Sequence, residues 1–99
     1  MSVVKVGEGF CLGRLLMTRG VNDLVAENLE FAKFVMASLR RHANGDWGDL
    51  CHEDLQENEN ALNKGSRLFS AYKMVGQPKI WIITEANRYA TTILFPEEY

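Results

Sequence analysis

Hydrophobic positions recur at helical spacing in one long segment of the chain, residues 28–42. Ala32 and Leu39 lie seven positions apart, and further apolar residues stand three or four positions from each of them. Asn28 is a suitable N-cap for this segment, and Gly45 is a natural terminator after its last, basic turn. The pattern therefore predicts an amphipathic helix with one face buried in a core.

A second, more polar helix is predicted over residues 50–64, with Asp49 as its N-cap and Gly65 at its end. Leu55 and Leu62 define a narrow apolar stripe, and nearly all other positions are polar. We therefore expect this helix to lie on the surface. The connection between the two helices is short, which predicts an antiparallel or steeply angled pair.

The other predicted elements are mostly strands, at residues 10–17, 66–75, 79–85 and 90–95. Thr18 is expected to cap a brief helical turn at residues 20–25. Residues 79–85 form the strongest predicted strand, because they are rich in β-branched and aromatic side chains. These elements predict an α+β fold in one domain, residues 1–99, with a two-helix N-terminal half packed on a C-terminal three- to four-stranded antiparallel sheet.

Composition supports a small folded domain. The chain has 99 residues, 46% of them hydrophobic and 10% aromatic, which suffices for one modest core. No apolar run approaches the length of a membrane span, and no secretion signal is recognisable. Cys11 and Cys51 show no metal-type spacing and are expected to be reduced thiols. The protein is therefore expected to be cytoplasmic.

Negative charge is concentrated in the middle of the chain. Residues 42–65 contain one basic residue, Lys64, against six acidic ones: Asp46, Asp49, Glu53, Asp54, Glu57 and Glu59. This acidic segment argues against direct contact with nucleic acid, which requires clustered Lys and Arg. It suits a basic surface on a protein partner. A solvated helix face with no partner is the simpler alternative.

Residues 42–54 hold the densest set of reactive groups. The possible metal ligands there are His42, Asp46, Cys51, His52 and Glu53. Their spacings match no established ligand pattern, so no metal and no cofactor are expected. Cys51 could pair with a histidine as a nucleophile near a helix N-terminus, but no third group completes such a site. A buried, inert Cys51 is the favoured interpretation, with His42 placed at the carbonyl end of its helix.

Trp47 has two possible functions. It could close the end of the core, with its indole N–H bonded to a carboxylate, or it could be an exposed anchor for a partner. The core plug is the favoured interpretation. Arg88 lies in a polar turn beside Glu85 and could pair with it. If Arg88 instead reached Asp46 or Asp49, the turn and the acidic loop would form one site.

Four stretches of the sequence carry a resemblance: Arg41-His42-x-x-Gly45-Asp46-Trp47-Gly48-Asp49, Ser66–Tyr72, Lys79–Arg88 and Thr91–Tyr99. Together they resemble a family of small bacterial proteins, usually labelled hypothetical or plasmid-related, that occur on plasmids and other mobile elements. The resemblance covers most of residues 13–99 and implies a bacterial cytoplasm and a mobile-element setting. Family members often have Asp where this chain has Asn87, so no carboxylate function is transferred there.

Two functional hypotheses follow. The first is a non-enzymatic protein that binds a protein partner through its acidic helix and tryptophan loop, as an accessory or counter-defence inhibitor. Its predicted binding residues are His42, Asp46, Trp47, Asp49, Glu53, Asp54, Glu57 and Arg88. The second is a small hydrolase or metal-dependent enzyme that uses His42, Asp46 and Asp49. A homodimer is also considered, because a small sheet leaves edges to cover.

Overall fold

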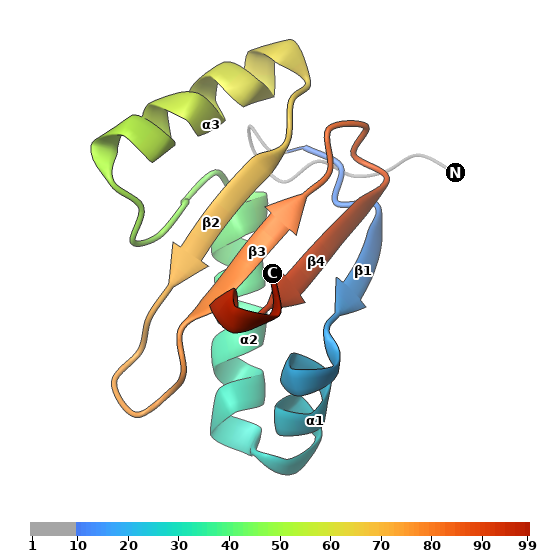
Figure 1. Cartoon of the computed structure of the whole chain (residues 1–99), viewed down its shortest axis with the longest axis vertical. Helices are drawn as coiled ribbons and strands as arrows, with labels where there is room; N and C mark the ends of the chain where they lie inside the picture. The colour runs from blue at the N-terminus through green and yellow to red at the C-terminus, as the bar shows by residue number, and fades with distance from the viewer. Residues whose placement is uncertain (1–9) are drawn as a thin grey trace.

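A four-stranded mixed sheet forms the centre of the structure, a computed structural model that describes residues 10–99 (Figure 1). The elements in chain order are β1 (Arg14–Met17), α1 (Arg19–Glu27), α2 (Leu29–Ala43), α3 (His52–Lys64), β2 (Leu68–Tyr72), β3 (Ile80–Thr84), β4 (Ala90–Leu94) and the 3-10 helix η1 (Pro96–Glu98). The strand order across the sheet is β1-β4-β3-β2. The predicted α+β class is confirmed.

The direction of β1 corrects the prediction of a purely antiparallel sheet. Strands β2, β3 and β4 form the predicted antiparallel meander, with Ile82 opposite Ile93. Strand β1 pairs with β4 in parallel, with Leu16 opposite Thr92. The direction of an edge strand depends on how often the chain changes direction between that strand and its neighbour in the sheet. The sequence of the strand itself does not encode this.

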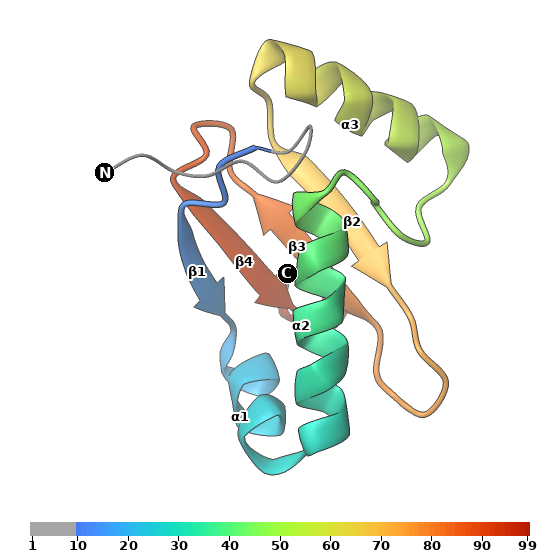
Figure 2. The ribbon, with the colours of Figure 1, turned by 180° about the vertical axis from the view of Figure 1, so that it is seen from behind.

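Helices α1 and α2 lie against one face of the sheet (Figure 2). The main core forms between them and the strands, from Val21, Phe31, Phe34, Val35, Leu39, Tyr72, Ile80, Ile82 and Ile93. The predicted N-cap of α2 is confirmed, because the Asn28 side chain accepts a hydrogen bond from the Phe31 amide at 3.0 Å. The apolar face of the helix at residues 28–42 therefore packs on the sheet as its periodicity predicts.

The C-terminal segment covers part of the opposite sheet face. The Tyr99 ring meets Trp81 edge-on with centroids 5.8 Å apart, and Trp81 meets Phe69 in the same way. Glu98 accepts hydrogen bonds from the Gly20 amide at 2.9 Å and from the Thr18 hydroxyl at 2.5 Å. Glu98 thus caps the N-terminus of α1, and the Thr18 side chain does not accept the capping bond that the sequence suggested.

Helix α3 lies beside β2 at a steep angle to α2 (Figures 1 and 2). It begins at His52 with Cys51 at the N-cap position, so the predicted start at Leu50 with Asp49 as N-cap is wrong. Gly65 ends the helix in the left-handed conformation, as predicted. Few residues of α3 are buried, in agreement with its polar pattern.

Candidate functional site

The loop between α2 and α3 runs along the free edge of β2. The Ala71 amide donates to the Trp47 carbonyl at 3.2 Å, and the Asp49 amide donates to the Ala71 carbonyl at 2.7 Å. Between them, Gly48 has a φ of 76°. A Cβ atom on Gly48 would lie only 2.0 Å from the Ala71 oxygen, so only glycine allows this close approach.

Both aspartates of the loop bind groups within the protein. Asp46 forms a two-point ion pair with Arg41, whose Nε lies 2.7 Å from the carboxylate. The hydrogen bond from Arg41 lowers the pKa of Asp46. Asp49 accepts a hydrogen bond from the Lys73 amide at 3.0 Å. The two carboxylates therefore fix the loop to α2 and to the end of β2, while both residues remain exposed.

Trp47 closes the end of the core. Its side chain is 3% exposed and packs against the ring of Phe10. The indole N–H donates to Glu59 Oε2 at 3.1 Å. The predicted core plug with a carboxylate partner is thus confirmed, and Trp47 has almost no surface with which to contact a partner.

His42 lies at the centre of a buried polar network. Its Nδ1 is 2.5 Å from the Ser70 hydroxyl, and its Nε2 is 2.8 Å from the Thr84 hydroxyl. The Thr84 and Thr91 hydroxyls are 2.7 Å apart, and Thr91 donates to the Leu12 carbonyl at 2.7 Å. His42 is fully buried, so its predicted contact with the carbonyl end of the helix is wrong and it cannot touch a partner.

The network also fixes the tautomer of His42. Because the Leu12 carbonyl can only accept, the Thr91 hydroxyl donates to it and accepts from Thr84. Thr84 then accepts from Nε2–H of His42, and Ser70 donates to Nδ1. Burial, with a smaller effect from the charge of Arg88, lowers the pKa of His42 to about 3. The imidazole is therefore neutral near pH 7, with its proton on Nε2.

Arg88 does not meet the acidic loop. Its guanidinium donates to the carbonyls of Ser66 and Ala61, at 2.5 and 3.1 Å, at the C-terminal end of α3. The single site that would have formed if Arg88 had reached Asp46 or Asp49 is therefore not formed, and the partner of Asp46 is Arg41. The carbonyl end of a helix carries a partial negative charge, so the positive charge of Arg88 is favourable at this end of α3. Arg88 holds α3 in place by its C-terminus.

Asn58 attaches the middle of α3 to β2. Its side-chain oxygen accepts from the Phe69 amide at 3.1 Å, and its NH₂ group donates to the Phe69 carbonyl. The side chain is 4% exposed and occupies the position between Leu55 and Leu62 on the apolar stripe. Asn58 thus substitutes for one residue of a neighbouring strand.

Replacing Asn58 with Asp tests this attachment. Aspartate cannot donate to the Phe69 carbonyl, so Asn58→Asp should lower the free energy of unfolding by about 1–3 kcal/mol in urea titrations. The same change at Asn60, which is exposed on α3, provides the control and should have little effect. Equal losses at both positions would contradict the attachment.

The remaining predicted residues lie on the outer face of α3. Glu53, Asp54 and Glu57 are all exposed. Cys51 is exposed as well, with its Sγ 3.3 Å from Asp54 Oδ2, so the prediction of a buried cysteine is wrong. The helix starts two residues later than expected, which leaves Cys51 at the N-cap and outside the apolar stripe.

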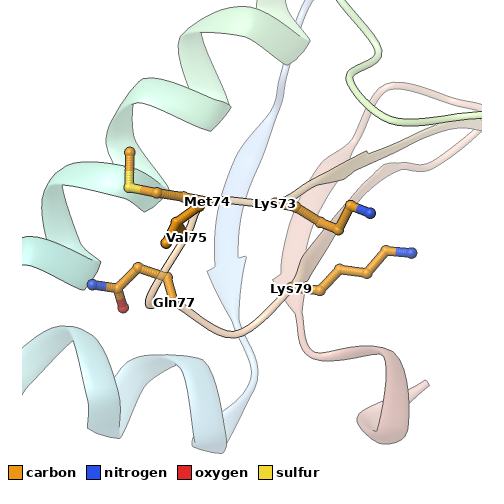
Figure 3. Close-up of a pocket in the computed structure, with 5 residues that line it drawn as sticks. All are labelled: Lys73, Met74, Val75, Gln77 and Lys79. Atoms are coloured by element: carbon orange, nitrogen blue, oxygen red, sulfur yellow. The ribbon is translucent and has the colours of Figure 1, made fainter.

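Among the described residues, His42, Asp46 and Asp49 do not converge on a common point. Within residues 10–99, no three His, Cys, Asp or Glu side chains are placed to hold a metal ion. A pocket of about 400 Å³ lies at the β2–β3 hairpin, lined by Lys73, Met74, Val75, Gln77 and Lys79 (Figure 3). Both ammonium groups there point away from Met74 and Gln77, and none of the lining residues is a predicted site residue.

Comparisons of the chain with protein-family models, curated proteins and solved structures found no match. Within the described part of the chain, every helix is too short or too polar to span a membrane. The geometry of α3 and of the loop that precedes it is therefore the basis for a functional proposal.

Sequence reasoning missed the partners of His42 and the function of Asn58. Ser70, Thr84 and Thr91 interrupt otherwise apolar strands at positions that face α2, which was a readable signal of a buried polar group. Asn58 lies three residues after Leu55 and four before Leu62, at a core-facing helical position. A polar residue at such a position indicates a buried hydrogen bond.

Proposed function

We propose that this chain is a non-enzymatic protein that binds a basic surface of a protein partner through the outer face of α3. The resemblance noted above suggests a bacterial cytoplasm and a mobile element as the setting. An accessory or counter-defence inhibitor that covers a basic groove on a host enzyme, such as a nuclease, fits both that setting and the charge of α3.

One observation carries the proposal: α3 presents exposed carboxylates that no described Lys or Arg neutralises. Glu57 lies four positions after Glu53 and three after Asp54 on one helix face, and none of the ion pairs among residues 10–99 involves these three residues. Like charges at this spacing destabilise a helix by about 0.2–0.5 kcal/mol per pair. Glu53 and Asp54 gain from the helix dipole in the first turn, but Glu57 does not. A basic partner would relieve this repulsion.

The way in which α3 is held supports the same proposal. Asn58 bonds the middle of the helix to β2, Glu59 bonds Trp47, and Arg88 bonds the C-terminal end. These polar attachments fix the inner face of the helix and leave its acidic face outward. A helix positioned in advance loses less conformational entropy when it binds a partner. In this proposal, Trp47 and Arg88 position the acidic face instead of contacting the partner.

The alternative of a hydrolase or metal-dependent enzyme required His42, Asp46 and Asp49 to converge. Each binds a different group: His42 is buried against Ser70, Asp46 pairs with Arg41, and Asp49 accepts from the backbone of β2. This arrangement supplies no common point for a substrate or an ion. The partner-binding function is therefore the one that we propose.

Reversing the charge of α3 tests the proposal. The triple variant Glu53→Lys, Asp54→Lys, Glu57→Lys should lose partner capture from lysate of the native host, and capture by the unmodified chain should weaken as salt is raised. The matched control reverses Asp23, Glu27 and Glu30, three exposed acids on α1 and α2, for the same change in net charge. Capture that survives the α3 reversal but not the control reversal would reject the proposal.

A further inference from the structure

The two edges of the sheet differ in how their backbone groups are covered. At the β2 edge, Asn58 bonds both the amide and the carbonyl of Phe69. The Trp47–Asp49 loop bonds both groups of Ala71, and the Asp49 carboxylate bonds the amide of Lys73. This edge is closed to a further strand.

The β1 edge is open among the described residues. No described strand pairs with its outer side, and all four of its residues are exposed. Leu15, Leu16 and Met17 are 54%, 41% and 41% exposed. An apolar edge strand with free backbone groups is a template for pairing with another strand.

The outward backbone groups of β1 can be assigned from its ladder with β4. The Arg14 amide donates to the Tyr89 carbonyl at 2.8 Å, and the Thr18 amide donates to the Ile93 carbonyl at 3.0 Å. Successive residues of a strand direct their backbone groups to opposite sides. The amides and carbonyls of Leu15 and Met17 therefore point away from β4.

We propose that β1 pairs with β1 of a second copy of this chain, antiparallel about a two-fold axis at Leu16. In this register Leu15 lies opposite Met17 of the second copy, and Met17 lies opposite its Leu15. All outward amides and carbonyls of both strands are then paired. An axis at Leu15 instead places Met17 opposite Gly13, whose φ of 66° takes it out of the strand conformation. The two sheets become one continuous sheet with a closed β2 edge at each end.

The side chains of β1 are self-complementary on both faces of the sheet. On the helix side, Leu15 and Met17 line an apolar groove of about 150 Å³ together with Val25 and Met36. Figure 2 shows this side, with β1 at the edge and α1 and α2 beside it. The same two side chains of the second copy extend this apolar surface across the axis. On the opposite face, Leu16 meets Leu16 of the second copy.

Charges at the ends of the paired strands are also complementary. The register places Arg14 opposite Thr18 of the second copy. The Thr18 hydroxyl is bonded to the Glu98 carboxylate at 2.5 Å, so a negative charge lies at that position. Arg14 is exposed, and it forms no ion pair within residues 10–99. In the dimer, Arg14 of each copy therefore lies near Glu98 of the other copy, once on each side of the axis. This charge complementarity favours a second copy of the chain as the partner of the β1 edge.

Sedimentation equilibrium of the full chain over a wide concentration range, about 1–200 μM, tests the dimer. The unmodified chain should form dimers. Leu16→Glu should raise the dimer dissociation constant at least about a hundredfold, because two like charges would face each other across the interface at the axis. Val75→Glu is the matched control, since Val75 is fully exposed in the β2–β3 hairpin, and it should leave the constant unchanged. Arg14→Glu should also weaken the dimer, whereas Arg14→Lys should preserve it.

Disulfide crosslinking tests the register in a chain with Cys11→Ser and Cys51→Ser. Leu16→Cys should crosslink two copies, because Cα atoms of a non-hydrogen-bonded antiparallel pair are about 4.5 Å apart. Leu15→Cys faces Met17 and should not crosslink. A chain that stays monomeric at every concentration, or that crosslinks through residue 15 and not 16, would overturn the proposal. This result does not depend on the partner of α3, because α3 lies at the opposite edge of the sheet.

Discussion

Lowering the pH from 7.5 to 4.5 is expected to reduce the free energy of unfolding by about 3 kcal/mol through His42 alone. The folded chain holds His42 as a neutral imidazole with a pKa of about 3, because the ring is buried between Ser70 and Thr84. In the unfolded chain His42 takes up a proton below its ordinary pKa of about 6.5. The stabilisation is therefore complete above that pH and is lost progressively as the pH falls toward 3.

Urea unfolding at several pH values measures this loss. The chosen range stays above the region in which Asp46 titrates, because its ion pair with Arg41 lowers its pKa. His52→Gln, at an exposed position of α3, is the control variant. NMR of the imidazole nitrogens should show His42 neutral, with the proton on Nε2, at pH 5. A protonated His42 at that pH, or stability that is flat between pH 7.5 and 4.5, would contradict the buried network.

Gly48→Ala is expected to destabilise the protein by about 3 kcal/mol or more, against about 1 kcal/mol for Gly65→Ala. Both glycines have a similar positive φ, 76° and 73°, so both variants place an L-residue in the left-handed region. Only Gly48 is also confined, with the Ala71 oxygen 2.0 Å from a Cβ and the Tyr72 ring close by. At Gly65 nothing lies within 4 Å of the Cβ position.

Comparing Gly48→Ala with Gly65→Ala separates the cost of a left-handed backbone from the cost of the clash with β2. Urea unfolding of the two variants gives both costs directly, and the difference reports the contact between the loop and β2. Amide exchange at Ala71 and Asp49 should accelerate in Gly48→Ala only, because the bonds from the Ala71 amide to the Trp47 carbonyl and from the Asp49 amide to the Ala71 carbonyl would be lost. Equal costs for the two variants would show that the loop does not depend on this contact.

Much of the fold was predictable because periodicity encodes local structure. The apolar spacing of residues 29–43 and the Asn28 cap specified α2, and the β-branched run at residues 80–84 specified β3. The direction and partner of β1 were not predictable, since four exposed residues carry no information about pairing with β4. The start of α3 was misplaced because Asp49, a good N-cap by type, bonds the edge of β2 instead.

The candidate site was only partly predictable, for a different reason. Trp47 was correctly expected to plug the core, because a large apolar ring can close a small core while its indole N–H bonds a carboxylate. Arg41 and Arg88 could both have paired with Asp46. In the structure Arg41 pairs with Asp46, and Arg88 bonds the Ser66 carbonyl near the end of α3 instead. The burial of His42 depended on hydroxyl groups from three strand positions. The strand pattern indicates a buried polar group at these positions, but no local spacing identifies His42 as its member on α2.

The dimer and the acidic face of α3 are compatible in one assembly. Pairing through β1 leaves α3 at each far end of the continuous sheet, beside the two β2 edges. Such a dimer would present two acidic helices to a partner with repeated basic surfaces, and binding at both would raise the overall affinity. The two proposals nevertheless use different surfaces and are tested separately.

Site-specific photo-crosslinking in the native host tests the central claim, that α3 contacts a protein partner, most directly. A photoreactive residue in place of Glu57 lies on the exposed acidic face of α3, and one in place of Glu27 lies on α1, where no partner is proposed. We expect a discrete crosslinked partner from position 57 and none from position 27. A partner crosslinked from position 27 alone, or no crosslink from position 57, would contradict it.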